Sequence, residues 1–207
     1  QAMVAPIEVK VEKGPGGKVF ISEGEVTSEG FATEGLDPMM NTPAGIACHV
    51  TGPVQSYATY PNYHFSGSYF KATYLDTDSF SGPFNHKIPD SPVVNNTDGS
   101  VVGYKYFNFD KLRRCEDIVL EFSLVPGGYG GELVIMTDSP YESRGGKVIG
   151  TLELNASMSQ EMTELQADID LAGMKPKGKH AVYFEFLSAS EGKSLCDLYS
   201  FRFRSGK

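Results

Sequence analysis

HAVYFEFLS, residues 180–188, decides the fold class, because large apolar side chains recur in it at every second position. Successive side chains of a β-strand point to opposite faces, so Val182, Phe184 and Phe186 would share one face. That face is apolar along its whole length. The stretch therefore predicts a strand with one side against a hydrophobic core.

The same alternation recurs along the chain, in short runs that end at Gly, Pro, Asn or Asp. β-Branched and aromatic residues are frequent in these runs, and 23 glycines and 12 prolines in 207 residues supply many turns. No stretch keeps a helical period for three turns. Short strands repeated with turns between them are typical of an all-β sandwich. The runs are 18–22, 45–50, 68–74, 100–109, 117–125, 132–137, 147–154, 164–171, 180–188 and 198–204.

The length fits a single domain, because one all-β sandwich often reaches about 200 residues. We expect residues 1–17 to be a linker or a short leading strand, and residues 18–207 to form the sandwich. The least regular segment, residues 36–67, predicts an enlarged loop. A loop of this length in a compact domain is functional or disordered, and its aromatic residues argue against disorder.

Charge and cysteine usage exclude several classes of partner. The chain has 18 Lys and Arg against 26 Asp and Glu, a net charge of −8, and its basic residues are scattered. Nucleic acid and anionic lipid are therefore poor partners. We expect neither a membrane span nor a signal peptide, because no long apolar run is present. Cys48, Cys115 and Cys196 form no C-x-x-C pair, so the spacing supports neither a zinc site nor a redox motif.

Carboxylates near the N-terminus are the one cluster that suggests site chemistry. Glu23 and Glu25 would point the same way on a strand, with Glu29 and Glu34 close behind. This arrangement suits a hard cation with oxygen ligands at least as well as it suits a pair of catalytic acids. Solvated strand carboxylates are the simpler alternative, since Glu is rarely buried unpaired. No nucleophile elbow, nucleotide-binding motif or histidine metal spacing is present, so we expect no enzyme.

Three tyrosines in YATYPNY, residues 57–63, are candidate ligand contacts. Tyr57, Tyr60 and Tyr63 are three residues apart, and a proline lies among them, so they belong to a loop. An exposed tyrosine offers an apolar face and a hydroxyl group, which together suit a sugar ring. Packing of this loop onto its own sandwich is the alternative, because large aromatic side chains are usually buried.

Four blocks follow one another in a fixed order: DGSVVGYKYFNFD (98–110), GGELVIMTDSPYESRGGKVIGTLEL (130–154), GKHAVYFEFLSAS (178–190) and LCDLYSFRF (195–203). Together they resemble the family 6 carbohydrate-binding modules, especially those attached to the C-terminus of glycoside hydrolase family 43 enzymes. The opening ISEGEVTSEGFATEG (21–35) is similar to the family's E-A-E strand followed by S-E-G-V. The resemblance implies a β-jelly-roll sandwich of two antiparallel sheets with calcium at a structural site.

The resemblance also implies roles for individual residues. Glu23 and Glu25 occupy the E-x-E positions that supply calcium ligands in the family. Asp197 stands where the family has its sugar-contacting Asn, and Tyr199 stands where it has a calcium-ligating Asp. The family's T-G-G-W-Q segment corresponds to residues 155–168, and the chain has no tryptophan. Replacement sugar contacts are therefore expected from Tyr57, Tyr60 and Tyr63, with Asp197.

The expected function is a non-catalytic carbohydrate-binding module that acts on plant cell-wall polysaccharide such as arabinan or xylan. Its partners would be the polysaccharide and a glycoside hydrolase domain in the same parent chain, and its location would be secreted or at the cell surface. The alternative is a structural accessory domain that packs on a family 43 catalytic domain and has a degenerate sugar cleft. A hydrolase using the acidic cluster ranks last.

Overall fold

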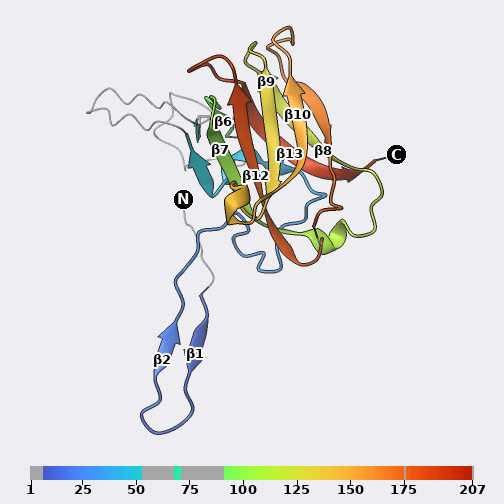
Figure 1. The fold of residues 1–207 in the computed structure, drawn as a ribbon. Coiled ribbons are helices and arrows are strands. Elements are labelled where there is room, and N and C mark those ends of the chain that lie inside the picture. Colours follow the sequence, from blue (N-terminus) through green and yellow to red (C-terminus); the bar gives the residue numbers. More distant parts are fainter. Residues whose placement is uncertain (1–6, 53–67, 71–90, 175, 207) are drawn as a thin grey trace, which may run out of the picture.

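The computed structural model describes residues 7–52, 68–70, 91–174 and 176–206, and these residues form two facing β-sheets and a separate hairpin (Figure 1). All strand pairs in the sheets are antiparallel. The expected all-β sandwich of antiparallel sheets is therefore confirmed. No helix among the described residues is long and apolar enough to cross a membrane.

We name each sheet after its central strand. The β12 sheet has the order β10 (Lys147–Leu154), β9 (Gly131–Thr137), β12 (Lys179–Ser188), β7 (Ser100–Asn108) and β4 (His49–Thr51). The β13 sheet has the order β11 (Thr163–Asp168), β8 (Ile118–Pro126), β13 (Cys196–Ser205), β6 (Val93–Val94) and β5 (Tyr69–Phe70), and β3 (Thr42–Pro43) also pairs with β13. Short 3-10 helices are η1 (Ala44–Ile46), η3 (Phe109–Lys111) and η4 (Glu142–Arg144).

Aromatic rings from both sheets meet in the core. Phe184 of β12 and Phe201 of β13 pack edge to face, with ring centroids 4.8 Å apart and planes at 89°. Val182 and Phe186 are likewise fully buried, which confirms the inward face predicted for residues 180–188. The hydroxyl of Tyr104 donates to the Ala44 carbonyl at 3.1 Å, so the one polar atom of this buried ring has a partner.

The outer face of the β12 sheet carries a second buried apolar cluster, formed by Val101, Val134, Met136, Ala181 and Tyr183. A Cβ atom on Gly103 would lie 2.5 Å from two ring carbons of Tyr183. The glycine therefore allows the tyrosine ring to lie directly against β7.

One expected strand differs from its prediction, and another is described only in part. The run 45–50 begins as η1, closed by a hydrogen bond from the Ala47 N–H to the Ala44 carbonyl, and only then becomes strand β4. Residues 42–51 of the expected loop thus carry regular structure paired to β13 and β7. Of the run 68–74, residues 71–74 lie outside the described residues, and β5 is the part that the structure describes.

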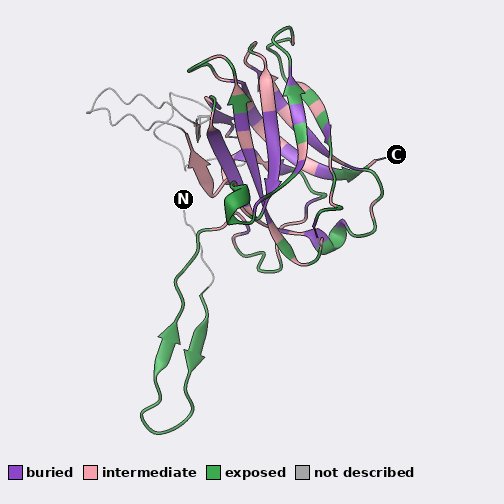
Figure 2. Cartoon of the chain, in the orientation of Figure 1, coloured by how far each residue is buried: buried purple, intermediate pink, exposed green. Residues whose placement is uncertain are grey.

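A hairpin of β1 (Val9–Val11) and β2 (Val19–Ile21) projects from the sandwich, and we name residues 7–22 the arm (Figure 2). Its turn uses Gly14 and Gly16 at positive φ, which other residues rarely adopt. The register pairs Val9 with Ile21 and Val11 with Val19, and these four side chains are 54% to 65% exposed. Because β2 lies beyond residue 17, the expected boundary at that residue falls inside the arm.

Candidate functional site

The outer face of the β13 sheet is polar, because its strands alternate between core and charged residues. In β8 the side chains of Leu120, Phe122 and Leu124 are fully buried in the core, so Glu121 and Ser123 point the other way. In β13, Phe201 and Phe203 are buried, so Ser200, Arg202 and Arg204 point outward. Polar and charged side chains therefore gather on this face.

A row of three side chains crosses the sheet at Glu121. Arg202 of β13 lies opposite it on one side, and Gln166 of β11 lies opposite it on the other. The Arg202 Nε donates to Glu121 Oε2 at 2.6 Å, and Arg204 Nη1 lies 3.3 Å from both carboxylate oxygens. The hydrogen bond from Arg202 holds the pKa of Glu121 below its usual range. Two arginines therefore fix one carboxylate in place.

A second row lies beside the first, with Ser200, Ser123 and Glu164 opposite one another on β13, β8 and β11. Asn41 comes directly before β3, which pairs with β13 at Ser200 and Phe201. Because two rows of a sheet face are adjacent, these side chains reach the same space as the arginine and its carboxylate.

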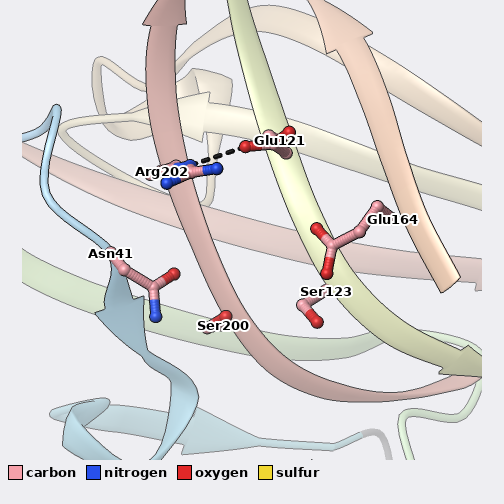
Figure 3. Close-up of a pocket in the computed structure, with 6 residues that line it drawn as sticks. All are labelled: Asn41, Glu121, Ser123, Glu164, Ser200 and Arg202. Carbon is pink, nitrogen blue, oxygen red and sulfur yellow. Dashed lines mark hydrogen bonds and ion pairs between the residues drawn. The ribbon is translucent and has the colours of Figure 1, made fainter. Parts of the chain in front are cut away.

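The two rows enclose a pocket of about 350 Å³ (Figure 3). Its lining residues are Asn41, Glu121, Ser123, Glu164, Ser200 and Arg202. The size lies at the lower end of the range for small-ligand sites. Every side chain of this lining offers a hydrogen bond, and together they include donors, acceptors and groups that do both. The pocket can therefore hold a ligand rich in hydroxyl groups through hydrogen bonds.

A larger hollow of about 710 Å³ lies between the edge strands β10 and β11. It runs along the open side of the sandwich, where the backbones of Gly150 and Asp168 come close together. No row of paired charged side chains like that at Glu121 converges on its described lining. We therefore take the polar pocket as the candidate site.

None of the sugar contacts predicted from the sequence is among the described residues that line the pocket. Asp197 of β13 lies opposite Val125, one row beyond Ser200 and Ser123 on the same face. It is thus next to the pocket without lining it. Tyr57, Tyr60 and Tyr63 lie outside the described residues.

The two predicted metal ligands, Glu23 and Glu25, have different surroundings. Glu25 accepts hydrogen bonds from Lys105 Nζ at 2.7 Å and from the Tyr106 hydroxyl at 2.8 Å, and the bond from Lys105 lowers the pKa of Glu25. Glu23 is exposed. Among the described residues, no three His, Cys, Asp or Glu side chains form a group that could hold a metal. A carboxylate with an ammonium group this close does not fit a calcium ligand. Calcium binding through Glu23 and Glu25 stays a prediction, and the contacts of Glu25 do not favour it.

Sequence reasoning missed the pocket, although its signal was present. Apart from Asp197, the sugar contacts predicted from the sequence are aromatic, and the described pocket lining has no aromatic residue. Polar residues at the outward positions of three predicted strands, 117–125, 164–171 and 198–204, were the available signal. This signal locates a pocket only when it is known which strands lie side by side in the sheet.

Comparisons with known proteins rest on structure. No family model matches the chain, and no curated protein matches it. A family 6 carbohydrate-binding module from Clostridium cellulolyticum in complex with xylose is 18% identical, with a TM-score of 0.53, over 82% of this chain and 99% of that one. The module CsCBM6-3 from Clostridium stercorarium in complex with cellobiose is 13% identical, with a TM-score of 0.52, over 82% and 96%.

A third similar structure is a glycoside hydrolase family 43 arabinoxylan arabinofuranohydrolase from Bacillus subtilis. It is 16% identical, with a TM-score of 0.53, and the match covers 95% of this chain but 33% of the enzyme. At these identities the likeness concerns the fold. The chain has the β-sandwich fold of the family 6 carbohydrate-binding modules.

Proposed function

We propose that the chain is a non-catalytic carbohydrate-binding module that holds polysaccharide in the polar pocket of the β13 sheet. The observation that carries this proposal is the convergence of Asn41, Glu164 and the Arg202–Glu121 pair on one hollow of the exposed sheet face. Two solved modules of the same fold are in complex with xylose and with cellobiose. Their sugars support a ligand rich in hydroxyl groups.

The finer proposal is that the ligand is plant cell-wall polysaccharide of the arabinan or xylan type. The similarity to an arabinoxylan arabinofuranohydrolase supports this choice. Such polymers lie outside the cell, which would place the protein at the cell surface or in the medium. A module tethered to a hydrolase can be useful at weak affinity, because tethering raises the effective concentration of substrate.

Affinity electrophoresis in gels that contain arabinan or arabinoxylan tests the proposal. The wild-type chain should be retarded, and Glu164→Ala should weaken binding about tenfold, because one charged acceptor for sugar hydroxyls is lost. Glu153→Ala is the matched control, since Glu153 is an exposed strand carboxylate on the other sheet. Equal retardation of both variants would remove the pocket from the proposal.

The alternative binding site for polysaccharide is the loop with Tyr57, Tyr60 and Tyr63. A chain with Tyr57, Tyr60 and Tyr63 all changed to Ala should lose binding if that loop holds the sugar. Loss there with full binding by Glu164→Ala would move the site from the sheet face to the loop.

A second candidate function is a structural accessory domain that packs on a family 43 catalytic domain. The arm favours it, because four exposed branched side chains form one apolar face, and such patches mark interaction surfaces. An isolated two-stranded hairpin is marginally stable in water, so a second layer would stabilise it. The match to the hydrolase covers 95% of this chain, against 82% for the isolated modules.

Amide hydrogen exchange tests the second candidate. The arm amides of β1 and β2 should become protected when a family 43 catalytic domain from the same organism is added. Val11→Lys combined with Ile21→Lys should abolish that protection and leave polysaccharide binding unchanged. Exchange that is the same with and without the catalytic domain would contradict docking through the arm.

A further inference from the structure

Residues 25–36, which we name the strap, cross the ends of β7 and β12. The strap runs beside β7, where the N–H of Leu36 donates to the Tyr106 carbonyl at 2.8 Å and the Asn108 N–H donates to the Leu36 carbonyl at 2.9 Å. The N–H of Glu29 donates to the Lys105 carbonyl at 3.0 Å. Backbone hydrogen bonds therefore place the strap's carboxylates next to the lysines of the sheet.

The first carboxylate of the strap is held by two groups of β7. Glu25 Oε1 lies 2.7 Å from Lys105 Nζ, and Glu25 Oε2 accepts from the Tyr106 hydroxyl. Burial, followed by the hydrogen bond to Glu25, raises the pKa of Tyr106 to about 12, so its hydroxyl remains a donor at neutral pH. Both oxygens of this carboxylate thus have partners.

The second carboxylate is buried. The side chain of Glu29 is 1% exposed, and its Oε1 lies 2.9 Å from Lys179 Nζ of β12. The same ammonium group donates to the Thr33 carbonyl at 3.1 Å and lies 5.3 Å from the centre of the Tyr106 ring. Lys179 therefore joins two parts of the strap to the sheet.

We infer that Lys105 and Lys179 supply, at this segment, the positive charge that the resemblance assigns to a structural calcium ion. Calcium needs six to eight oxygen ligands at about 2.3–2.6 Å. A carboxylate oxygen with an ammonium group at 2.7 Å is already neutralised, and a divalent ion beside two ammonium groups would be repelled. The strap is thus fixed to the sandwich by ion pairs and needs no metal.

Two buried oxygen atoms of the strap are the available candidates for binding a cation. Glu29 Oε2 and Thr27 Oγ1 are buried and have no hydrogen-bond partner among the described residues. One carboxylate oxygen and one hydroxyl supply fewer oxygens than calcium requires, and Lys179 holds the other oxygen of the same carboxylate. Water satisfies such atoms equally well.

Thermal unfolding of the chain with excess EDTA and with millimolar CaCl2 tests this inference. The wild-type Tm should be the same in both solutions. Lys179→Met should lower Tm by several degrees in both, because it leaves the buried Glu29 without its counter-charge. Lys193→Met, which changes an exposed lysine near Tyr129, is the matched control and should leave Tm unchanged.

A charge swap separates an ion pair from a metal ligand even if the lysine variants unfold. Glu25→Lys should lower Tm, and adding Lys105→Glu should restore most of it, because the exchanged side chains can still pair. A wild-type Tm that rises with CaCl2 and falls with EDTA would overturn the inference, as would failure of the swap to rescue Glu25→Lys.

Discussion

The outer faces of the two sheets differ, although their inner faces are alike. Both sheets present phenylalanine and leucine to the shared core. On its other side the β12 sheet carries the buried apolar cluster of Met136 and Tyr183, whereas the β13 sheet carries Glu121 paired with two arginines of β13. The inner faces therefore define the sandwich, and the outer faces distinguish a sheet with a buried apolar cluster from a sheet with a polar pocket.

The largest effect should come from placing a charge on the covered face. Met136→Asp would bury an unpaired carboxylate in a site that is 3% exposed. We expect a loss of about 3 kcal/mol or more in the free energy of unfolding, because burying an unpaired charge is among the most destabilising changes. Urea denaturation followed by tyrosine fluorescence measures it.

The matched change on the polar face is Ser123→Asp. Ser123 lies on the outer face of the β13 sheet, as Met136 does on the β12 sheet, but it is partly exposed and next to polar groups. We expect a loss of at most about 1 kcal/mol, because a solvated carboxylate keeps its hydration and its repulsion from Glu164 on the neighbouring strand is screened by water. If both substitutions cost the same, the two faces do not differ as described.

The sequence predicted the inner faces well because they depend on local alternation alone. Val182, Phe184 and Phe186 lie where period two places them. Ala181 and Tyr183 are also buried, and the same alternation would have placed them in water. Burial of a second face depends on what covers the sheet, which is a property of distant segments.

The candidate site was less predictable for the same reason. Glu121 and Arg202 are 81 residues apart, and their pairing requires β8 and β13 to be neighbours in register. Asn41 reaches the pocket because β3 pairs with β13, which no local pattern indicated. The arm shows the converse. VFI was predicted as strand and VKV as part of a linker or a short leading strand, and both form strands whose apolar face is uncovered.

An intermediate effect is expected where the covered face packs most closely. Gly103→Ala would place a methyl group 2.5 Å from the ring of Tyr183, which must then move from its place against β7. We expect a loss of about 1–3 kcal/mol, as for other overpacking substitutions. Gly173→Ala is the control, because nothing lies within 4 Å of the added atom. Equal urea midpoints for the two variants would show that the tyrosine ring moves without cost.

The smallest effect should come from the polar face and should depend on pH. Glu121→Gln removes the charge that faces Arg202 and Arg204, and we expect a loss of about 1 kcal/mol at pH 7, since the pair is partly solvated. The bond from Arg202 lowers the pKa of Glu121 in the folded chain below 4.5. Its stabilisation is therefore present above pH 4.5 and is lost as pH falls through the lowered pKa. The difference in urea midpoint between wild type and Glu121→Gln should thus be largest at pH 7 and shrink as the pH falls below 4.5 through the lowered pKa. A difference that does not shrink in acid would mean that the carboxylate acts through packing and not through its charge.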